Sequence, residues 1–388
     1  MPANILLIIC PPEMETEVDA QVGRVFDGWD DENRPALRTH YLDELLEAKE
    51  CPDDISAIWL FLPAGASSDQ MNNAIDKAES WNMSLILSRS DESLPLGSSL
   101  RHGTIIAPFN TDGGQIRLIL QTLHSQSDAL FRMRQELTVT RHEMLLARRT
   151  QRAFLPNELP TVNNVSFSVL YRPASYVSGD IYDVQRLDER NVGFYVADAV
   201  GHGVPAALVT MFIKRSMPTK DIQYNRYRII MPDEALSRLN WDMIDQESST
   251  SEDSDVRFAT ACYAVLDSVS LELRVARAGH PPPVILRTNG ETEFVSPPGL
   301  PLGVLNKTRY DPETKLVNPG DRLVFYSDGF ETVFDSDPQP DYVPPEFMDL
   351  RDGTPQEALK ELERKVDQRL QGQSLKDDLT AMVIDIAQ

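Results

Sequence analysis

The hydrophobic pattern changes character twice along the chain and divides it into three regions. Between residues 1 and about 115, short runs that are apolar on both faces alternate with longer polar stretches. Such runs are typical of buried parallel strands, and the stretches between them are long enough for crossover helices. We therefore predict an α/β domain in this region. Its expected strands are Asn4–Cys10, Ile55–Leu62, Met83–Leu87 and Thr104–Ala107.

A seven-residue period follows in the region 116–155. One series is Ile116, Leu123, Leu130, Leu137 and Met144, and a second is Ile119, Gln126, Met133, Thr140, Ala147 and Phe154. Together they form a heptad seam with no Pro or Gly between Gln115 and Leu155, which predicts a coiled-coil helix. The alternative is a single helix packed on its own domain. Because a helix of roughly 60 Å would outrun a small domain, we favour a two-stranded parallel coiled coil and hence a homodimer.

Beyond residue 156, apolar strand-like runs are separated by turn residues. The turns Asp188–Asn191 and Asp267–Ser270 predict hairpins. A helix should begin after Gly201-His202-Gly203, because Pro205 suits a first helical turn, and another should cover Gln356–Leu370. The expected strands are Val165–Arg172, Ile181–Leu187, Val192–Ala197, Phe258–Leu266, Leu271–Ala278, Arg322–Tyr326 and Leu379–Ile386.

Charge and composition exclude several classes of protein. The chain has 60 acidic and 37 basic residues, a formal net charge of −23, which disfavours nucleic-acid and membrane-surface partners. No apolar run reaches the roughly 18–20 residues of a membrane span. The run Asn4–Cys10 has no preceding Lys or Arg and leads into Pro11–Pro12, unlike a secretory signal. The distant Cys10, Cys51 and Cys262 predict neither a disulfide framework nor a zinc site. We expect a cytoplasmic protein.

Acidic motifs stand at strand ends or turns of the third region. A single Asp-Gly pair is more often a turn than a ligand, but neighbouring strands of a sheet would bring these carboxylates together. Several like charges converging without a cation would be costly, so the set predicts a metal site. Oxygen-only ligands favour Mg²⁺ or Mn²⁺ over zinc. The motifs are Ser178-Gly179-Asp180 with Asp183, Ala197–Gly203, Ser327-Asp328-Gly329 and Asp377–Thr380.

The order of these motifs, together with Ala278–Pro282, Pro301–Gly303 and Phe154-Leu155-Pro156, resembles the SpoIIE/RsbU branch of PPM-type metal-dependent serine/threonine phosphatases. The resemblance covers nearly all of the chain after residue 155. It implies an α+β fold of two stacked antiparallel sheets flanked by helices, with the metal ions at one edge of the sandwich.

The same resemblance implies which residues hold the metal. Asp198 looks like the carboxylate that bridges two Mn²⁺ or Mg²⁺ ions, and the carbonyl of Ala199 would complete the second site. Asp180, Asp328 and Asp377 match the remaining acidic ligands. We therefore expect these aspartates to be the catalytic residues.

Further residues are candidates for a supporting role around the metal ions. Asp378 adjoins Asp377 and could be a ligand or support one; the sequence leaves this open. His202 and His280 could each act as general acid for the leaving oxygen, although a histidine that stabilises a turn or supports a ligand is the commoner case. The supporting candidates are Asp183, His202, Gly203, His280 and Asp378.

The N-terminal region resembles the receiver domain of bacterial response regulators at two corners, Leu62-Pro63 and Ala107-Pro108-Phe109. The residues that a working receiver needs are replaced. Cys10-Pro11-Pro12 follows the first strand in place of an acidic pair, Trp59 stands at the phosphoacceptor Asp, and Ala107 stands at the Lys. Without carboxylates no divalent-metal site can form, so we predict a degenerate receiver.

Two functions are compatible with these features of the sequence. One is a protein phosphatase acting on a phosphorylated anti-sigma-factor antagonist of the STAS class, regulated through the coiled coil by an N-terminal domain that senses an unknown partner or ligand. The other is a catalytically silent dimeric interaction module of the same fold. The complete set of ligand aspartates favours the enzyme. The expected domains are a receiver-like domain (1–115), a coiled-coil helix (116–155) and a phosphatase domain (156–388).

Overall fold

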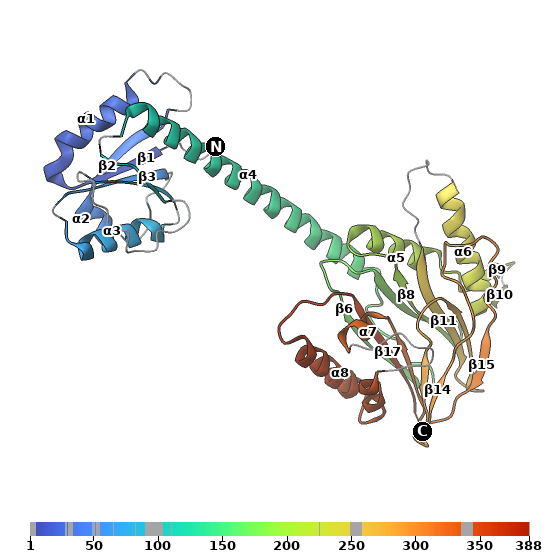
Figure 1. Cartoon of the computed structure of the whole chain (residues 1–388). Coiled ribbons are helices and arrows are strands. Elements are labelled where there is room, and N and C mark those ends of the chain that lie inside the picture. Colours follow the sequence, from blue (N-terminus) through green and yellow to red (C-terminus); the bar gives the residue numbers. More distant parts are fainter. Residues whose placement is uncertain are drawn as a thin grey trace. The chain divides into compact units, whose positions relative to one another are not determined.

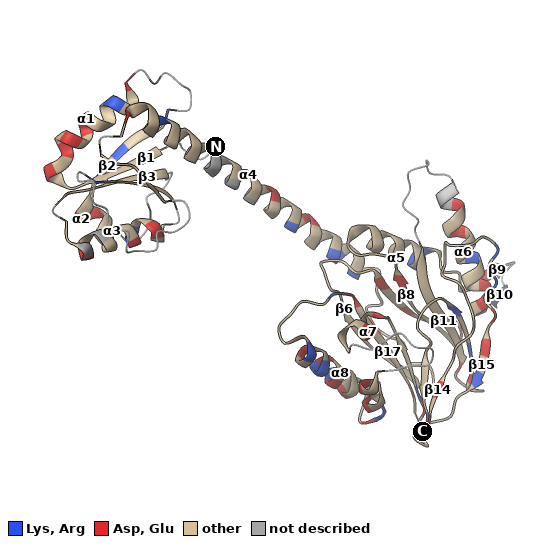
Figure 2. Ribbon diagram, viewed as in Figure 1, with Lys and Arg blue, Asp and Glu red and all other residues tan. Residues whose placement is uncertain are grey.

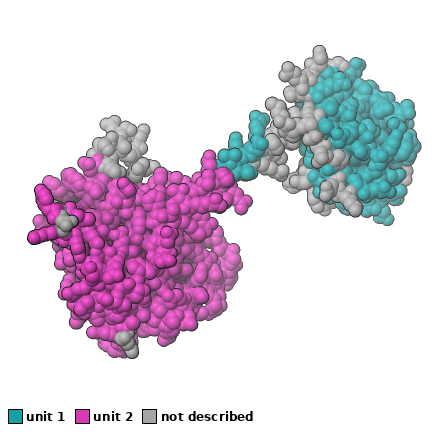
Figure 3. Space-filling model, turned by 180° about the vertical axis from the view of Figure 1, so that it is seen from behind, with its two compact units in different colours: residues 1–140 teal, residues 141–388 magenta. Residues whose placement is uncertain are grey.

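The computed structural model describes residues 5–27, 29, 34–48, 51, 55–64, 66–81, 83–89, 104–109, 111–224, 226–248, 258–334 and 344–387. The chain forms two compact units, Met1–Thr140 and Arg141–Gln388 (Figures 1 and 3). Among the described residues, none of the helices combines the length and the apolar character that crossing a membrane requires.

Unit 1 is built on a parallel sheet of five strands in the order β2-β1-β3-β4-β5. This is the order of doubly wound, flavodoxin-like folds, and it agrees with the predicted α/β organisation. The strands are β1 (Ile5–Cys10), β2 (Ala36–Tyr41), β3 (Ile55–Leu62), β4 (Ser84–Arg89) and β5 (Thr104–Ile106).

Helices cover both faces of this sheet. On one face, α1 (Glu15–Phe26) and the first turns of α4 (Gly113–Arg152) pack over Ile8 and Trp59. On the other face, residues of α2 (Leu42–Glu47) and α3 (Ser68–Ser80) pack over the alternate side chains of β1 and β3. A short 3-10 helix, η1 (Pro12–Met14), precedes α1.

The helix expected from the heptad pattern is present as α4, which runs for 40 residues without interruption. Charges of both signs lie along its exposed length (Figure 2). Two residues of the predicted seam, Met133 and Leu137, are 57% and 60% exposed. Leaving such side chains in water is unfavourable by roughly 1.5–3 kcal/mol each relative to burial. Pairing of α4 with a second copy remains a prediction.

Unit 2 is a sandwich of two five-stranded sheets in which the paired strands are antiparallel. The first sheet has the order β15-β12-β11-β8-β7 and the second the order β14-β13-β16-β17-β6. In the first sheet the strands are β7 (Asp180–Arg186), β8 (Asn191–Ala199), β11 (Ala259–Asp267), β12 (Glu272–Ala278) and β15 (Glu313–Leu316). In the second they are β6 (Val165–Arg172), β13 (Val284–Leu286), β14 (Thr292–Phe294), β16 (Arg322–Tyr326) and β17 (Leu379–Ile386).

The inner faces of the two sheets share one apolar core. At its centre, the ring of Phe194 meets those of Phe167 and Phe325 edge to face, at 5.3 and 5.1 Å between centroids. Such aromatic contacts fix the spacing of packed sheets. The predicted fold of two stacked antiparallel sheets flanked by helices is confirmed.

Helices cover both outer faces of the sandwich (Figure 1). On the first sheet lie α5 (Val204–Ser216) and α6 (Pro232–Ser248), with the hairpin β9 (Lys220–Gln223) and β10 (Arg226–Ile229) between them in sequence. On the second sheet lie α7 (Gly329–Val333), η2 (Pro345–Arg351) and α8 (Pro355–Leu370).

Candidate active site

Carboxylates from both sheets meet at one end of the sandwich. Asp180 begins β7 and lies directly opposite Asp198 in the β7–β8 ladder. Asp328 follows β16, and Asp377 precedes β17. Because β16 and β17 are paired antiparallel, Asp328 at the end of one strand lies close to Asp377 before the start of the other. Hydrogen bonds from the neighbouring Ser327 and Thr380 to Asp180 place both pairs of aspartates at the same edge of the sandwich.

Asp180 is held by hydroxyl groups of the second sheet. Ser327 Oγ and Thr380 Oγ1 donate to Asp180 Oδ2 at 2.7 and 2.6 Å. The carboxylate is buried, with 1% of the residue exposed, and two donors on one oxygen favour its ionised form. In the sequence, Ser327 and Thr380 stand out only as members of motifs; their common partner is apparent only when the two sheets are stacked.

Oxygen atoms converge beside Gly179. A Cβ atom at this residue would lie 3.1 Å from the Ala199 carbonyl oxygen, 3.3 Å from Asp198 Oδ1 and 3.3 Å from the Gly201 carbonyl oxygen. Because Gly179 has no side chain, it leaves a small space lined by oxygen atoms. Oxygen is the ligand type that Mg²⁺ and Mn²⁺ prefer. The donor set mixes one carboxylate with backbone carbonyls. In the part of the chain that the structure describes, no three His, Cys, Asp or Glu side chains form a ready metal site by themselves.

The electrostatics of the cluster also fit a cation. Burial, followed by the charges of Asp180, Asp328 and Asp377, raises the pKa of Asp198. Burial likewise raises the pKa of Asp180, against the opposing effect of its two hydroxyl donors. Desolvation also raises the pKa values of Asp328 and Asp377. Asp328 is exposed, so solvent weakens its electrostatic effect on the neighbouring carboxylates. A divalent cation would reverse these shifts and let the carboxylates ionise.

The adjacent residues Asp377 and Asp378 differ in their contacts. Asp378 is buried, and its two oxygens accept the backbone N–H groups of Ala174 and Gly179 at 2.7 and 2.6 Å. Asp377 Oδ1 accepts the N–H of Asp378, and its side chain is half-buried near Asp328. Asp378 thus fastens the segment 174–179, whereas the charge of Asp377 acts on Asp328, and both lie close enough to influence Asp198.

The structure places Asp183 on the opposite side of the first sheet from Asp180. Successive side chains of a strand point to opposite faces, and three positions separate the two residues. Asp183 Oδ1 forms an ion pair with Lys214 Nζ of α5 at 2.5 Å, and its Oδ2 accepts from Gln185. It supports the packing of α5 and does not join the carboxylate cluster.

The two candidate histidines have contrasting surroundings. His280 is buried, its Nδ1 lies 2.7 Å from Thr260 Oγ1, and burial lowers its pKa to about 3. His202 is exposed, in the turn before α5, and its charge lowers the pKa of Asp377. Gly201 and Gly203 flank His202 with φ of 87° and 79°, a conformation that glycine adopts without strain.

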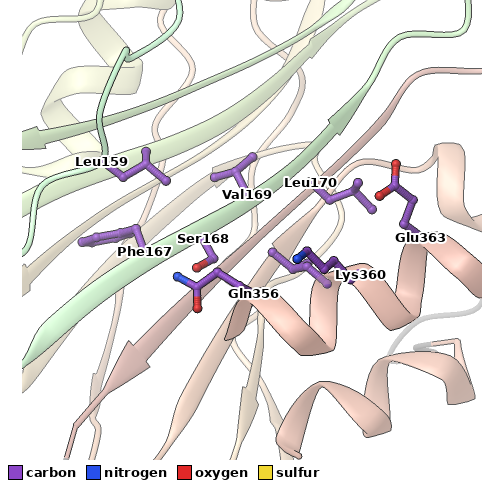
Figure 4. A pocket seen from close by; sticks show the side chains of 9 residues that line it. Leu159, Phe167, Ser168, Val169, Leu170, Gln356, Lys360 and Glu363 are labelled. Atoms are coloured by element: carbon purple, nitrogen blue, oxygen red, sulfur yellow. The ribbon is translucent and has the colours of Figure 1, made fainter. Parts of the chain in front are cut away.

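A groove of about 340 Å³ lies apart from the acidic cluster, between β6 and α8 (Figure 4). Phe167 and Val169 contribute apolar walls, and Lys360 and Glu363 of α8 add charged groups. None of the clustered aspartates lines it. The chemistry therefore has to be sought at the carboxylate edge.

Comparison with known proteins identifies the family. The family described as Stage II sporulation protein E (SpoIIE) matches residues 188–387, just over half of the chain. The chain belongs to the SpoIIE family. The match includes the motifs at Asp198, Asp328 and Asp377.

Among curated proteins, two relatives of this SpoIIE-family chain come from Bacillus subtilis (strain 168). Phosphoserine phosphatase RsbP is 27% identical over 192 residues, which cover 49% of this chain and 45% of RsbP. Phosphoserine phosphatase RsbU is 27% identical over 188 residues, covering 48% and 52%. The chain thus spans about half the length of these relatives.

A solved structure confirms the SpoIIE-family fold. The SiaA-PP2C domain of Pseudomonas aeruginosa aligns with a TM-score of 0.52 and 20% identity, covering 64% of this chain and 98% of that domain. At this identity the similarity shows the fold of unit 2 and nothing about substrates.

Proposed function

We propose that the protein is a metal-dependent phosphatase that hydrolyses phosphoserine or phosphothreonine on a protein substrate. The observation that carries this proposal is the convergence of Asp198, the Ala199 carbonyl and three further aspartates at one edge of a SpoIIE-family sandwich. The similarity to two phosphoserine phosphatases supports the same reaction class.

In this proposal the site holds two Mn²⁺ or Mg²⁺ ions. Asp198 would contribute to both ions and the Ala199 carbonyl would complete the second site, while Asp180, Asp328 and Asp377 would supply the remaining acidic ligands. When bound, such ions supply Lewis-acid polarisation of a phosphoryl group and a water of lowered pKa. Asp378 would contribute indirectly, by accepting the backbone N–H groups of Ala174 and Gly179 and so holding the segment before Asp180.

The chain's own residues would orient the reaction. Ser327 and Thr380 fix the carboxylate of Asp180, and Asp378 fixes the preceding loop. His280 is buried and neutral, which removes it as a proton donor to the leaving alkoxide. His202, exposed beside Asp377, is the remaining histidine that could donate this proton.

The substrate class and regulation follow from the family resemblance. We propose a phosphorylated anti-sigma-factor antagonist of the STAS class as substrate. Unit 1 would act as a degenerate receiver-like regulatory domain for a protein or small-ligand signal, and a homodimer would form through the exposed seam of α4, which includes Met133 and Leu137.

A catalytically silent module of the same fold is the alternative. Hydrolysis of para-nitrophenyl phosphate distinguishes an active phosphatase from a catalytically silent module. The phosphatase proposal expects hydrolysis that depends on added Mn²⁺, is lost with EDTA and returns when Mn²⁺ is restored. Release of phosphate from a phosphorylated STAS-class protein would then test the substrate class. Absence of Mn²⁺-dependent hydrolysis of either compound would favour the silent module.

Unit 1 should not accept a phosphoryl group from acetyl phosphate. Trp59 at the acceptor position is fully buried, and its indole N–H donates to Ser88 Oγ at 2.9 Å. Ser88 in turn donates to the Ala107 carbonyl at 2.7 Å, so the position is part of a packed core. Intact mass measurement after incubation with acetyl phosphate and Mg²⁺ should show no added phosphate, while an intact receiver domain in parallel gains one. An acid-labile aspartyl phosphate in unit 1 would contradict the degenerate-receiver interpretation.

A further inference from the structure

We propose that the loop 304–309, together with Val200, is a docking surface for the phosphoprotein substrate. It fits a partner whose surface around the phosphorylated residue is apolar and acidic. The loop lies beside the metal site, exposes apolar side chains and carries two basic residues. The inference rests on the proposed phosphatase function and adds to it the chemistry by which a substrate is recognised.

The loop follows a segment that continues the metal-site edge of the first sheet. Leu302 pairs with Ala259 through two backbone hydrogen bonds of 2.8 and 3.1 Å, and Ala259 lies opposite Ala199 in the β8–β11 ladder. The Val200 N–H donates to the Phe258 carbonyl at 3.1 Å. Since neighbouring strands are about 4.8 Å apart, Leu302 lies about 10 Å from Ala199, whose carbonyl is a proposed metal ligand. A protein bound with its phosphoserine at the metal site would therefore also cover the loop.

Apolar side chains are exposed along this edge. Val200, Val304 and Leu305 are 45%, 52% and 56% exposed. Single exposed apolar residues are ordinary on a protein surface, whereas a group of them beside a site indicates an interaction surface. A partner that covers these side chains removes them from water, and this favours its association with the loop.

A buried side chain of α6 holds the loop in place. Asn240 is 1% exposed; its Nδ2 donates to the Leu305 carbonyl at 3.1 Å, and its Oδ1 accepts the Gly303 N–H at 2.8 Å. Thr308 Oγ1 also donates to the Leu305 carbonyl, at 2.7 Å. A surface that is ordered before binding loses less conformational entropy when a partner docks. The exposed side chains are therefore presented on a pre-formed support.

The end of the loop carries positive charge, in contrast to the chain as a whole. Lys307 and Arg309 are exposed, and among the residues that the structure describes neither forms an ion pair. Because the chain has a net charge of −23, its overall field repels an acidic partner. At this loop the two cations attract acidic side chains and steer their approach toward the metal site. An apolar and acidic face around the phosphoserine is the chemistry that fits this surface.

The experiment uses the full chain with Mn²⁺ and two phosphoserine peptides of equal length, one flanked by Leu and Glu and the other by Ser and Lys. The readout is kcat/KM for each peptide divided by kcat/KM for para-nitrophenyl phosphate, because this ratio cancels changes in the chemical step. We expect the wild type to prefer the Leu/Glu peptide. The double variant Val304→Ser, Leu305→Ser should lower the ratio for that peptide about tenfold, as for residues central to an interface.

Reversing the charge of the loop should change the preference as well as weaken it. The double variant Lys307→Glu, Arg309→Glu should lower the ratio for the Leu/Glu peptide about fivefold at low salt, and less at high salt, which screens exposed charges. The same variant should raise the ratio for the Ser/Lys peptide. A damaged fold would lower both ratios, so the opposite changes report the charge of the docking surface.

Matched controls lie at the other end of the sandwich. Val269, 61% exposed, belongs to the turn in which β11 ends, and β11 begins at Ala259 beside the metal edge. Arg226 is exposed in β10, next to Tyr227, which interacts with Asp188 of the β7–β8 turn. Val269→Ser and Arg226→Glu should keep the wild-type ratios for both peptides.

Hydrolysis of para-nitrophenyl phosphate without a preference between the peptides, or wild-type ratios in both double variants, would overturn the docking surface and leave the proposed function intact. A lower mass of the Ser variant in light scattering would assign the surface to contact between copies of this chain and would also overturn the inference. If the wild type hydrolyses none of these compounds, the proposed function fails. Fluorescence anisotropy of the labelled peptides with Mn²⁺ then decides: weaker binding of the Leu/Glu peptide by both double variants supports docking, and unchanged or absent binding overturns it.

Discussion

Replacing Asp198 with Asn should lower phosphatase turnover by at least about a thousandfold, because a metal site contributes several kcal/mol to such a reaction. Asp198 lies opposite Asp180 in the sheet, and its Oδ1 belongs to the oxygen-lined space at Gly179. The substitution preserves the size of the side chain but removes a charge and a strong metal ligand. Hydrolysis of para-nitrophenyl phosphate at saturating Mn²⁺ measures the loss.

The fold should survive this substitution. In the metal-free protein, Asp198→Asn removes one of several like charges that repel one another, so its melting temperature should equal or exceed that of the wild type. Asp242→Asn, on the exposed surface of α6, is the matched control and should keep wild-type turnover. Near-wild-type activity of Asp198→Asn would show that the ligand assignment is mistaken.

Replacing both Met133 and Leu137 with Asp should convert a dimer into monomers. In a single chain these seam residues are 57% and 60% exposed, and burial of each in a paired helix is worth roughly 1.5–3 kcal/mol before ordering costs. A micromolar dimer needs about 8 kcal/mol, which several such residues from each helix can supply. Light scattering at tens of micromolar protein should report the change in mass.

The matched control for the seam is Val139→Asp. Val139 is 58% exposed on the same helix but lies outside both heptad series, so this variant should remain dimeric. A wild-type protein that is monomeric at the same concentration would contradict the coiled coil. A monomeric double variant with unchanged turnover and regulation would contradict the coupling between pairing and catalysis.

Strands with an apolar run or a clear apolar–polar alternation can be predicted from the sequence almost to the residue. Ile55–Leu62, Val165–Arg172, Arg322–Tyr326 and Leu379–Ile386 match β3, β6, β16 and β17. The strand β2 cannot be predicted in this way. It lies at the sheet edge, and its sequence ALRTHY is largely exposed, so it carries neither an apolar run nor a clear alternation. Its conformation comes from pairing with β1.

The composition of the site can be inferred from motifs, but the direction of each side chain cannot. Asp377 and Asp378 are neighbours in sequence, and only the backbone donors at Ala174 and Gly179 distinguish their contacts. The separation of Asp183 from the cluster depends on the register of β7 and on Lys214 of α5.

The carboxylate site joins residues that are far apart along the chain: Thr380 and Asp180 are 200 positions apart, and Asp378 and Gly179 are 199 apart. Contacts over such distances form late in folding, because a long loop must close first. Proteins fold from the N-terminus as they are synthesised, and unit 1 and α4 precede the whole sandwich. In the proposed dimer, a nascent chain could therefore acquire its regulatory part, and even its partner, before its catalytic centre exists. The proposed phosphatase would then be regulated from the moment its active site forms.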